Sequence, residues 1–566
     1  MSDYVIRDAR VRTCDAAGTV AEAVAVRDGR IVAVGALEEV EAAAGSTADQ
    51  VSAGGATVLP GLIDTHPHVM HFSIFSEGLV DLADAASHAE IEARFRARAA
   101  EVPAGEWVMG TPVGEAHYFL RRSWRDLAEG ELPDRHLLDR ACPDHPALIQ
   151  AWAPVTPNTI VLNTAGLRRL GITKGTDGRI GGVEIEKESD GEPSGRLHGR
   201  VTNYYSNDPY MTSLLAQLPL LNPAAIGPGT IRGMSEFNAM GVTTGYEGHA
   251  MDFPLIEGYR WLHSEGKLSM RILCAPEAEP YGLPWTEPLG DEEFEARLEQ
   301  ALAMVELGDE RFRIDGLTIG RGGPCWPGLL LLDRPYLGPD GEQTEGVSFV
   351  SRERAAEAIR FCAERGLRLN IVTAGTGEHD EYLEDLEALG RPALETEGRP
   401  WIVQHIYVIR EAQARRFAAL GIDATTSMSF SWGKGEMIAE RVGEDALADL
   451  VPLRRLLDAG LRVGCGTDWG PKNVFEQIAL AVEPVYAASG RAGAAPGIAR
   501  EEALAMWTRE AAAVLRWEGI GTIEPGNRAD LAIVDRDPID CPLDELAATR
   551  VLATLLDGEP VHGSLE

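Results

Sequence analysis

Basic residues are scarce in this chain. Its 566 residues include 52 Lys and Arg against 88 Asp and Glu, which gives a formal net charge of -36. Because such a field repels phosphate backbones and acidic membrane surfaces, we expect neither a nucleic-acid nor a membrane partner. Lysine is especially rare, with five residues: Lys174, Lys187, Lys267, Lys434 and Lys472.

Cysteine pairs and long apolar runs are missing too. The seven cysteines are widely spaced and form no CxxC pair, so neither a disulfide framework nor a thiolate zinc site is indicated. The first residues contain no basic region followed by an apolar stretch, and no run of 18 apolar residues occurs. We therefore expect a soluble, cytoplasmic protein.

The remaining composition is that of an ordinary globular chain, with 45% hydrophobic and 25% charged residues. The length allows roughly three to five compact units, or one large barrel with attachments.

Strand-like segments with turns occupy both ends of the chain. Asp28-Gly29 separates two β-rich runs in AVAVRDGRIVAVG and predicts a hairpin. Residues 522–538 and 550–563 have the same character. Because chain termini often lie close together, we predict one β-domain built from residues 1–60 and 516–566.

The second half alternates apolar runs with amphipathic segments. The runs are RILCAP (271–276), RIDGLTIG (313–320), LRLNIVTAG (367–375), PWIVQH (400–405) and LRVGCGTD (461–468). Helices are predicted at 291–307, 352–366, 411–420, 445–459, 474–488 and 501–517. Continuously apolar strands indicate a parallel sheet, so we predict an α/β fold with a (β/α)8 TIM barrel over 61–515. Residues from about 100 to 225 fit no such period and are predicted to be an insertion.

Four residues follow predicted strands and could bind a metal ion. His66 and His68 follow VLPGLID, and side chains two residues apart in a strand share a face. His405 ends WIVQ and Asp468 ends LRVGCGT, which places both where barrels hold their active sites. The alternatives are a polar loop for the histidine pair, a core position for His405 and a helix cap for Asp468.

Longer segments resemble a known family. GLIDTHPH (61–68), GCGTDWGP (464–471) and TIEPGNRADLAIVDRDP (522–538) are similar to the amidohydrolase superfamily, in its branch of N-substituted formamide deformylases and related amidohydrolases. LPDRHLLDRACPDHPALIQ (132–150), LNTAGLRRLGIT (162–173) and DGEPSGRL (190–197) extend the resemblance through the insertion. It implies a metal-dependent hydrolase on a (β/α)8 barrel, with a β-sandwich built from both termini.

The chain departs from this family at several positions. Strand five of the family ends in a metal-binding histidine, where this chain has Thr373 and Gly377. Strand six commonly reads Glu-His, where this chain has Gln404-His405. A strand-four lysine is carbamylated in some relatives, whereas Arg311 stands nearby here and a guanidinium cannot form a carbamate. A carbamate-bridged pair of metal ions is therefore not expected.

Substrate recognition is expected to differ as well. Asn158 stands where the branch usually has a histidine, five residues before Asn163. Further candidates for the substrate site, or for the lost ligand, follow other predicted strands or lie in loops. They are Glu115, His117, Glu247, His249, Glu378, His379 and Trp469, and Arg311 and Thr373 are candidates for the substrate site as well. Polar surface positions, or a buried aromatic for Trp469, explain them as well.

We interpret the chain as a hydrolase of small amides, formamides or carbamates. His66, His68 and Asp468 are expected to hold one principal divalent metal ion, zinc by preference, with His405 as a ligand or a carbonyl-polarising neighbour. Asp468 is expected to act as general base and then general acid. The alternatives are a C–O or C–C bond hydrolase, a deaminase, or a descendant that binds ligands without catalysis. A homodimer is also compatible with the sequence.

Overall fold

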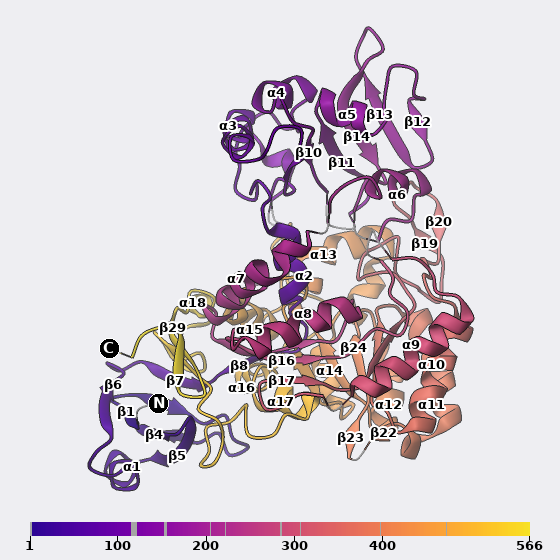
Figure 1. The fold of residues 1–566 in the computed structure, drawn as a ribbon. Helices are drawn as coiled ribbons and strands as arrows, with labels where there is room; N and C mark the ends of the chain where they lie inside the picture. Colours follow the sequence, from indigo (N-terminus) through magenta and orange to yellow (C-terminus); the bar gives the residue numbers. More distant parts are fainter. Residues whose placement is uncertain are drawn as a thin grey trace.

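The computed structural model describes residues 3–114, 122–151, 155–203, 205–220, 222–282, 286–305, 307–396, 398–470 and 472–565. It shows a TIM-barrel-like α/β body, an N- and C-terminal β-region below it and a separate α/β unit above it (Figure 1). No helix in these ranges is long and apolar enough to cross a membrane.

Two parallel sheets form the body. The first has the order β17-β16-β15-β8 and the second β18-β21-β24-β25-β26. Their strands are β8 (Leu62–Asp64), β15 (Val242–Glu247), β16 (Arg271–Cys274), β17 (Phe312–Ile314), β18 (Leu317–Gly320), β21 (Leu369–Thr373), β24 (Ile402–His405), β25 (Asp423–Thr426) and β26 (Val463–Cys465). Most of these strands are buried along their whole length, as the apolar runs predict for strands covered on both faces.

Backbone contacts join the two sheets at both seams. The N–H of Thr65, just after β8, donates to the carbonyl of Cys465 at 3.1 Å. At the other seam, β17 and β18 are separated only by Asp315-Gly316, and the N–H of Ala278 donates to the carbonyl of Thr318 at 2.7 Å. Gly316 has φ +84, and a Cβ there would lie 2.5 Å from the Arg368 carbonyl oxygen, so this interruption needs glycine.

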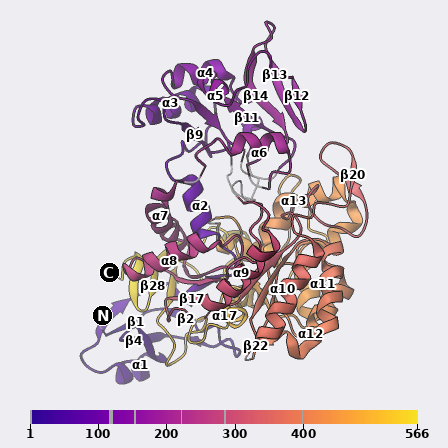
Figure 2. The same cartoon turned by 45° about the vertical axis from the view of Figure 1, so that its right-hand side comes forward.

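Helices pack around these sheets (Figure 2). They are α8 (Phe253–Ser264), α9 (Asp291–Met304), α10 (Arg352–Arg365), α11 (Thr376–Leu389), α12 (Glu411–Leu420), α13 (Met428–Arg441), α14 (Leu453–Asp458), α15 (Val474–Val482), α16 (Arg500–Ala505) and α17 (Arg509–Leu515). In α10, Ala355, Ala358, Ile359 and Cys362 form one buried stripe, and Gly366 ends the helix with φ 63.

The predicted helices at 291–307, 352–366 and 411–420 match α9, α10 and α12 closely. The helices predicted at 445–459, 474–488 and 501–517 are longer than the helices observed there. Pro452 separates the 3₁₀ turn Glu444–Asp449 from α14 within the helix expected at 445–459. The 501–517 segment is α16 and α17, because Thr508 has φ -132 and ψ -110, outside the helical region. The helix expected at 474–488 ends at Val482, two residues before Pro484.

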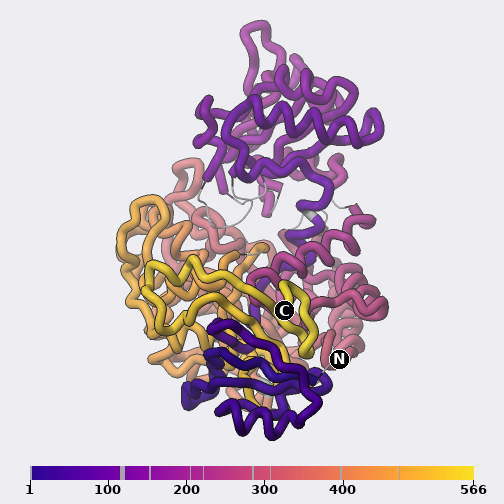
Figure 3. Tube along the Cα trace, turned by 90° about the vertical axis from the view of Figure 1, so that its left-hand side faces the viewer, coloured from indigo at the N-terminus to yellow at the C-terminus, as the bar shows by residue number. Residues whose placement is uncertain are grey.

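Strands from both termini lie side by side (Figure 3). One sheet has the order β5-β4-β1-β6, with β1 (Tyr4–Arg7), β4 (Ala23–Arg27), β5 (Arg30–Gly35) and β6 (Asp49–Ser52). The other has the order β29-β28-β27-β7-β2-β3, with β2 (Arg10–Arg12), β3 (Val20–Ala21), β7 (Thr57–Pro60), β27 (Leu531–Val534), β28 (Val551–Leu556) and β29 (Glu559–Gly563). The two sheets share one apolar core. The Asp28-Gly29 hairpin between β4 and β5 is confirmed, with φ of 50 and 72.

The upper unit contains a six-stranded sheet of order β12-β13-β14-β11-β10-β9. Its strands are β9 (Val108–Gly110), β10 (Ala147–Ile149), β11 (Asn158–Leu162), β12 (Arg179–Ile180), β13 (Val183–Lys187) and β14 (Pro193–Gly199). Helices α3 (His88–Ala99), α4 (Arg135–Ala141), α5 (Thr164–Arg169) and α6 (Pro209–Leu215) accompany it. Helix α3, which precedes residue 100, shares the core of this unit through Ile91 and Phe95. The chain returns to the body through α7 (Ile226–Asn238), which packs against α2 (Val69–Ser76).

A buried ion pair joins the body to the terminal strands. Arg271 of β16 donates to Asp530, just before β27, from Nε at 2.7 Å and from Nη2 at 2.9 Å, and both side chains are buried. Asp557 also pairs with Arg271, so loss of Asp530 leaves the buried guanidinium only partly compensated and costs up to about 3–5 kcal/mol, the penalty for an uncompensated buried charge. We therefore expect Asp530→Ala to lower the urea midpoint of unfolding, measured by tryptophan fluorescence.

Asp540→Ala is the matched control for this prediction, because the Asp540 carboxylate that pairs with Arg10 and Arg12 is 53% exposed. Exposed pairs contribute about 0–1 kcal/mol. Equal shifts of the urea midpoint in the two variants would show that the buried ion pair contributes no more to stability than the exposed one.

Candidate metal centre

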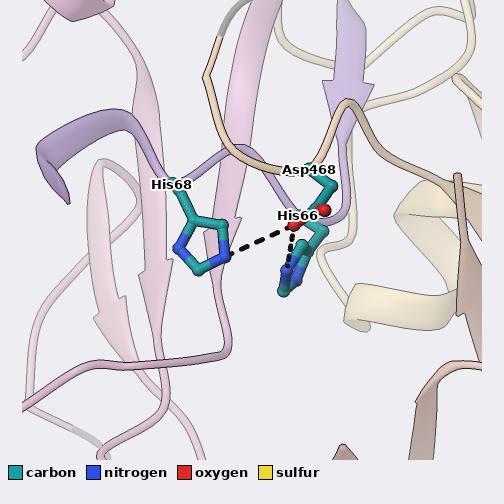
Figure 4. A group of neighbouring side chains, drawn as sticks. All are labelled: His66, His68 and Asp468. Carbon is teal, nitrogen blue, oxygen red and sulfur yellow. Dashed lines mark ion pairs between the residues drawn. The ribbon is translucent and has the colours of Figure 1, made fainter. Parts of the chain in front are cut away.

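Three predicted ligands converge beyond the carboxyl ends of β8 and β26 (Figure 4). His66 Nε2 lies 3.1 Å from Asp468 Oδ1, and His68 Nε2 lies 3.5 Å from the same oxygen. His405, at the end of β24, brings its Nε2 to 3.3 Å from His66 Nε2. All four side chains are buried.

These separations suit a tetrahedral ion. Donors about 2.0–2.1 Å from a tetrahedral Zn²⁺ lie about 3.3–3.4 Å from one another. The spacings of 3.1, 3.3 and 3.5 Å bracket that value. Three imidazoles and one carboxylate are also ligands that zinc accepts. The residues present therefore fit a divalent metal ion.

The charge states favour metal binding as well. Burial lowers the pKa of His66, His68 and His405, so their rings are neutral and can offer lone pairs. Burial alone would raise the pKa of Asp468, but the hydrogen bond with His66 and the neighbouring charges outweigh it and keep this pKa well below its ordinary range. The carboxylate is therefore ionised.

The backbone is strained at this point. His68, His405 and Asp468 have φ of 51, 74 and 52, in the left-handed region that non-glycine residues seldom adopt. Each such residue costs of order 1–3 kcal/mol and persists only where its surroundings hold it. Asp64 supplies part of that hold, because its carboxylate accepts the N–H of His66 at 2.9 Å and the hydroxyl of Thr467 at 2.7 Å. Burial raises the pKa of Asp64 to about 6.

The sequence model that describes the Amidohydrolase family matches residues 49–562 of this chain. The chain belongs to the amidohydrolase family. Membership makes it a hydrolase that acts on carbon–nitrogen bonds.

The chain is also similar to individual proteins, and the solved structures among them share its fold. An N-substituted formamide deformylase from Arthrobacter pascens is 29% identical over 99% of this chain and 98% of its own length. The crystal structure of an uncharacterized metal-dependent hydrolase from Pyrococcus horikoshii OT3 has a TM-score of 0.71 at 20% identity, covering 96% of this chain and 100% of that one. Atrazine chlorohydrolase TrzN from Arthrobacter aurescens TC1, complexed with zinc, has a TM-score of 0.54 at 16% identity, covering 100% of this chain and 96% of that one.

Three further predicted residues of the amidohydrolase lie beside the ligands. The His249 ring stacks on His66 with 5.8 Å between centroids, and the Trp469 ring lies 5.3 Å from that of His68. Thr373 ends β21 directly opposite His405 in the strand register. The two ring nitrogens of His249 contact Glu277 Oε1 at 3.2 Å and the Tyr205 hydroxyl at 2.8 Å, and its role as a substitute for the lost ligand stays a prediction.

Other predicted residues lie elsewhere. Arg311 precedes β17 and pairs with Asp557, at the amino end of the strands, so the expectation that it lies at the substrate site is wrong. His379 packs edge-on against Phe417 of α12, between two outer helices, where burial lowers its pKa to about 3. Asn158 begins β11 in the upper unit, and its side-chain oxygen accepts the N–H of Thr159. Glu115 and His117 lie outside the described residues.

The two predicted carboxylates not yet described, those of Glu378 and Glu247, accept hydrogen bonds from neighbouring groups of the fold. Glu378 accepts the N–H groups of Gly322 at 2.8 Å and Ala374 at 3.1 Å. Glu247, at the end of β15, accepts the Tyr259 hydroxyl at 2.6 Å, and burial raises its pKa to about 7.

Several residues at the site had not been singled out from the sequence. Asp64 lies within the GLIDTHPH motif, and His71 follows that motif, so both had a local signal. Glu277 directly follows the apolar run RILCAP (271–276) and so had the signal of a residue after a predicted strand. Tyr205 and Lys434 had none, because their chain positions are remote from the motifs. Lys434 is fully buried under the rings of Trp326 and Phe430, and burial lowers its pKa to about 8.

Proposed function

We propose that this amidohydrolase hydrolyses a non-peptide C–N bond in a small amide, formamide or carbamate, using one divalent metal ion held by His66, His68 and Asp468. The observation that carries the proposal is the convergence of two imidazole nitrogens on one oxygen of Asp468, at 3.1 and 3.5 Å. The 29% identical relative, an N-substituted formamide deformylase, supports the substrate class.

When bound, the ion would act as a Lewis acid and would lower the pKa of a water molecule in the site from about 15.7 toward about 7. Asp468 would take a proton from this water as the water oxygen attacks the carbonyl carbon, and would deliver that proton to the leaving nitrogen as the C–N bond breaks. His405, whose Nε2 lies 3.3 Å from His66 Nε2, is either a further ligand or the group that polarises the substrate carbonyl.

The substrate approaches from the side of His249. Tyr205, the hydrogen-bond partner of His249, has φ 54. Its ring packs against those of Tyr281 and Phe349, with 5.9 and 5.5 Å between ring centroids. Tyr281 and Phe349 line a cavity of about 130 Å³. A partly aromatic wall beside the ligands suits an apolar substituent on the substrate.

We further propose that the two parallel sheets close into a single (β/α)8 barrel, with β17 and β18 as one interrupted strand. In this division residues 61–515 form the barrel with its insertion, while residues 1–60 and 516–566 form a β-sandwich. The seam hydrogen bonds and the shared core of the two terminal sheets support it.

One tightly bound metal ion per chain is the expected stoichiometry. None of the five lysines lies on β17 or β18 to bridge a second ion, and β21 ends in Thr373 rather than histidine. Elemental analysis of the purified protein and anomalous scattering from its crystals measure this directly. Two equally occupied ions about 3.5–4 Å apart would contradict it.

A substrate panel tests the reaction itself. Formamides, other small amides, carbamates, esters and aminated heterocycles are incubated with the metal-replete protein, and amine or ammonia release is measured. Release of an amine from the first three groups supports the proposal. A protein that cannot be loaded with metal and turns over none of them would instead be a non-catalytic binding protein.

A further inference from the structure

A second group of buried donors lies behind the ligand His68. One ring nitrogen of His68, one of His71 and a carboxylate oxygen of Glu247 lie within 4.8 Å of one another. All three side chains are buried, with exposed fractions of 3, 1 and 1%. His68 Nδ1, Glu247 Oε2 and the ring nitrogens of His71 have no side-chain hydrogen-bond partner among the described residues, and the His71 ring also faces the backbone of Ala250.

The local fold aims Glu247 at these rings. Its Oε1 accepts the Tyr259 hydroxyl at 2.6 Å and the N–H of Met70 at 3.3 Å, at the start of α2. Helix α2 begins directly after His68 and carries His71 on its first turn. With Oε1 fixed in this way, Oε2 is the oxygen left for the two histidines.

Tautomer chemistry shows what the group does. His68 directs Nε2 toward Asp468 Oδ1, so a metal ion takes the lone pair of Nε2 and the ring proton resides on Nδ1. A metal-binding histidine almost always donates its other N–H to a carboxylate, a carbonyl or a water. Two partners that each lie about 2.8 Å from one tetrahedral water are about 4.6 Å apart, which falls within the 4.8 Å limit on the separations in this group.

We propose that Glu247 is a positioning residue for the metal centre: one bridging water, shared with His71, accepts the Nδ1–H of His68 and donates to Glu247 Oε2, which fixes the orientation of that ligand. A second metal ion in the same pocket is disfavoured, because binding through both nitrogens of His68 would require removal of the N–H proton that its neutral ring carries. The inference rests on the proposed metal centre.

The test compares Zn²⁺ dissociation constants, measured by competition with a chelator, between the native protein and three variants. Glu247→Gln is expected to bind Zn²⁺ about 10–100-fold more weakly. Tyr259→Phe removes the hydroxyl that donates to Glu247 Oε1 and leaves every metal ligand in place, so a smaller loss of Zn²⁺ affinity is expected. This variant also provides the test if Glu247→Gln does not fold. Glu378→Gln, the matched control, removes another buried carboxylate and is expected to leave the affinity unchanged.

The visible spectrum of the Co²⁺-substituted protein gives an independent readout, since a reoriented His68 shifts its bands in Glu247→Gln but not in Glu378→Gln. Affinities within threefold of the native value in both Glu247→Gln and Tyr259→Phe would overturn the inference. So would a native protein with two ions, one of which Glu247→Gln loses, because that result would make the pocket a cation site. A native protein that binds no ion refutes the metal centre itself, whereas unchanged affinity in a protein that binds one refutes only the role of Glu247.

Discussion

Replacing Asp468 by asparagine is expected to lower kcat by about 10²–10⁴-fold, the usual contribution of general acid–base catalysis. Asparagine keeps the side-chain shape and one oxygen that can face His66 and His68, but its amide cannot accept a proton. Metal content should therefore be largely retained and KM little changed, while the chemical step slows. The measurement is steady-state kinetics on a substrate found with the panel, using protein of verified metal content.

Asp423→Asn is the matched control for Asp468→Asn. Asp423 is also buried, but it is the first residue of β25 and so lies at the amino end of the parallel strands, whereas Asp468 lies beyond their carboxyl ends. Asp423 pairs with Arg462 and Arg516. Its replacement should affect stability more than kcat. If kcat of Asp468→Asn falls by less than about threefold, the loss is far smaller than that expected for a proton shuttle. That result would move the general base to His405.

Loss of either histidine of the His66-Pro67-His68 pair is expected to abolish stoichiometric metal binding. In His66→Ala and His68→Ala one of the two imidazoles that lie within 3.5 Å of Asp468 Oδ1 is removed. The affinity should therefore fall by more than the loss of about 10–100-fold that is typical of an outer hydrogen-bond partner. Atomic emission on dialysed protein measures the metal content, and circular dichroism checks that the variants are folded.

His379→Ala serves as the control for both histidine variants. His379 is equally buried but packs against Phe417 between two outer helices. It should keep its metal ion even if its stability falls. Full metal content in both His66→Ala and His68→Ala would remove the basis for the proposed centre.

Much of the site could be predicted because its chemistry is local in sequence. His66 and His68 are two residues apart, and Asp468 and His405 each follow an apolar run, so the parallel-strand rule alone brings them to one edge. Arg311 shows the limit of this reasoning. It lies one residue before β17, at the amino end, and the direction of the strand therefore carries it away from the ligands.

The roles of His249 and His379 depended on packing. Both are buried histidines that follow predicted strands, and nothing local distinguishes them. The difference arises because His249 meets Tyr205 and Glu277 from separate parts of the chain, whereas His379 faces away from the strands toward α12. Helix lengths failed for a similar reason, since the breaks at Pro452 and Thr508 interrupt segments whose apolar period continues.

The sequence by itself determined the α/β alternation, the hairpin at Asp28-Gly29 and the four candidate ligands, because strand period, turn residues and motif spacing are local properties. Only the tertiary structure decided that Asp64, His71 and Glu247 stand behind those ligands and that Lys434 is buried beside them. Such contacts join residues up to 403 positions apart, as between Asp64 and Thr467. Their geometry follows from the pairing of distant strands and the packing of helices upon the sheets, which no local pattern encodes.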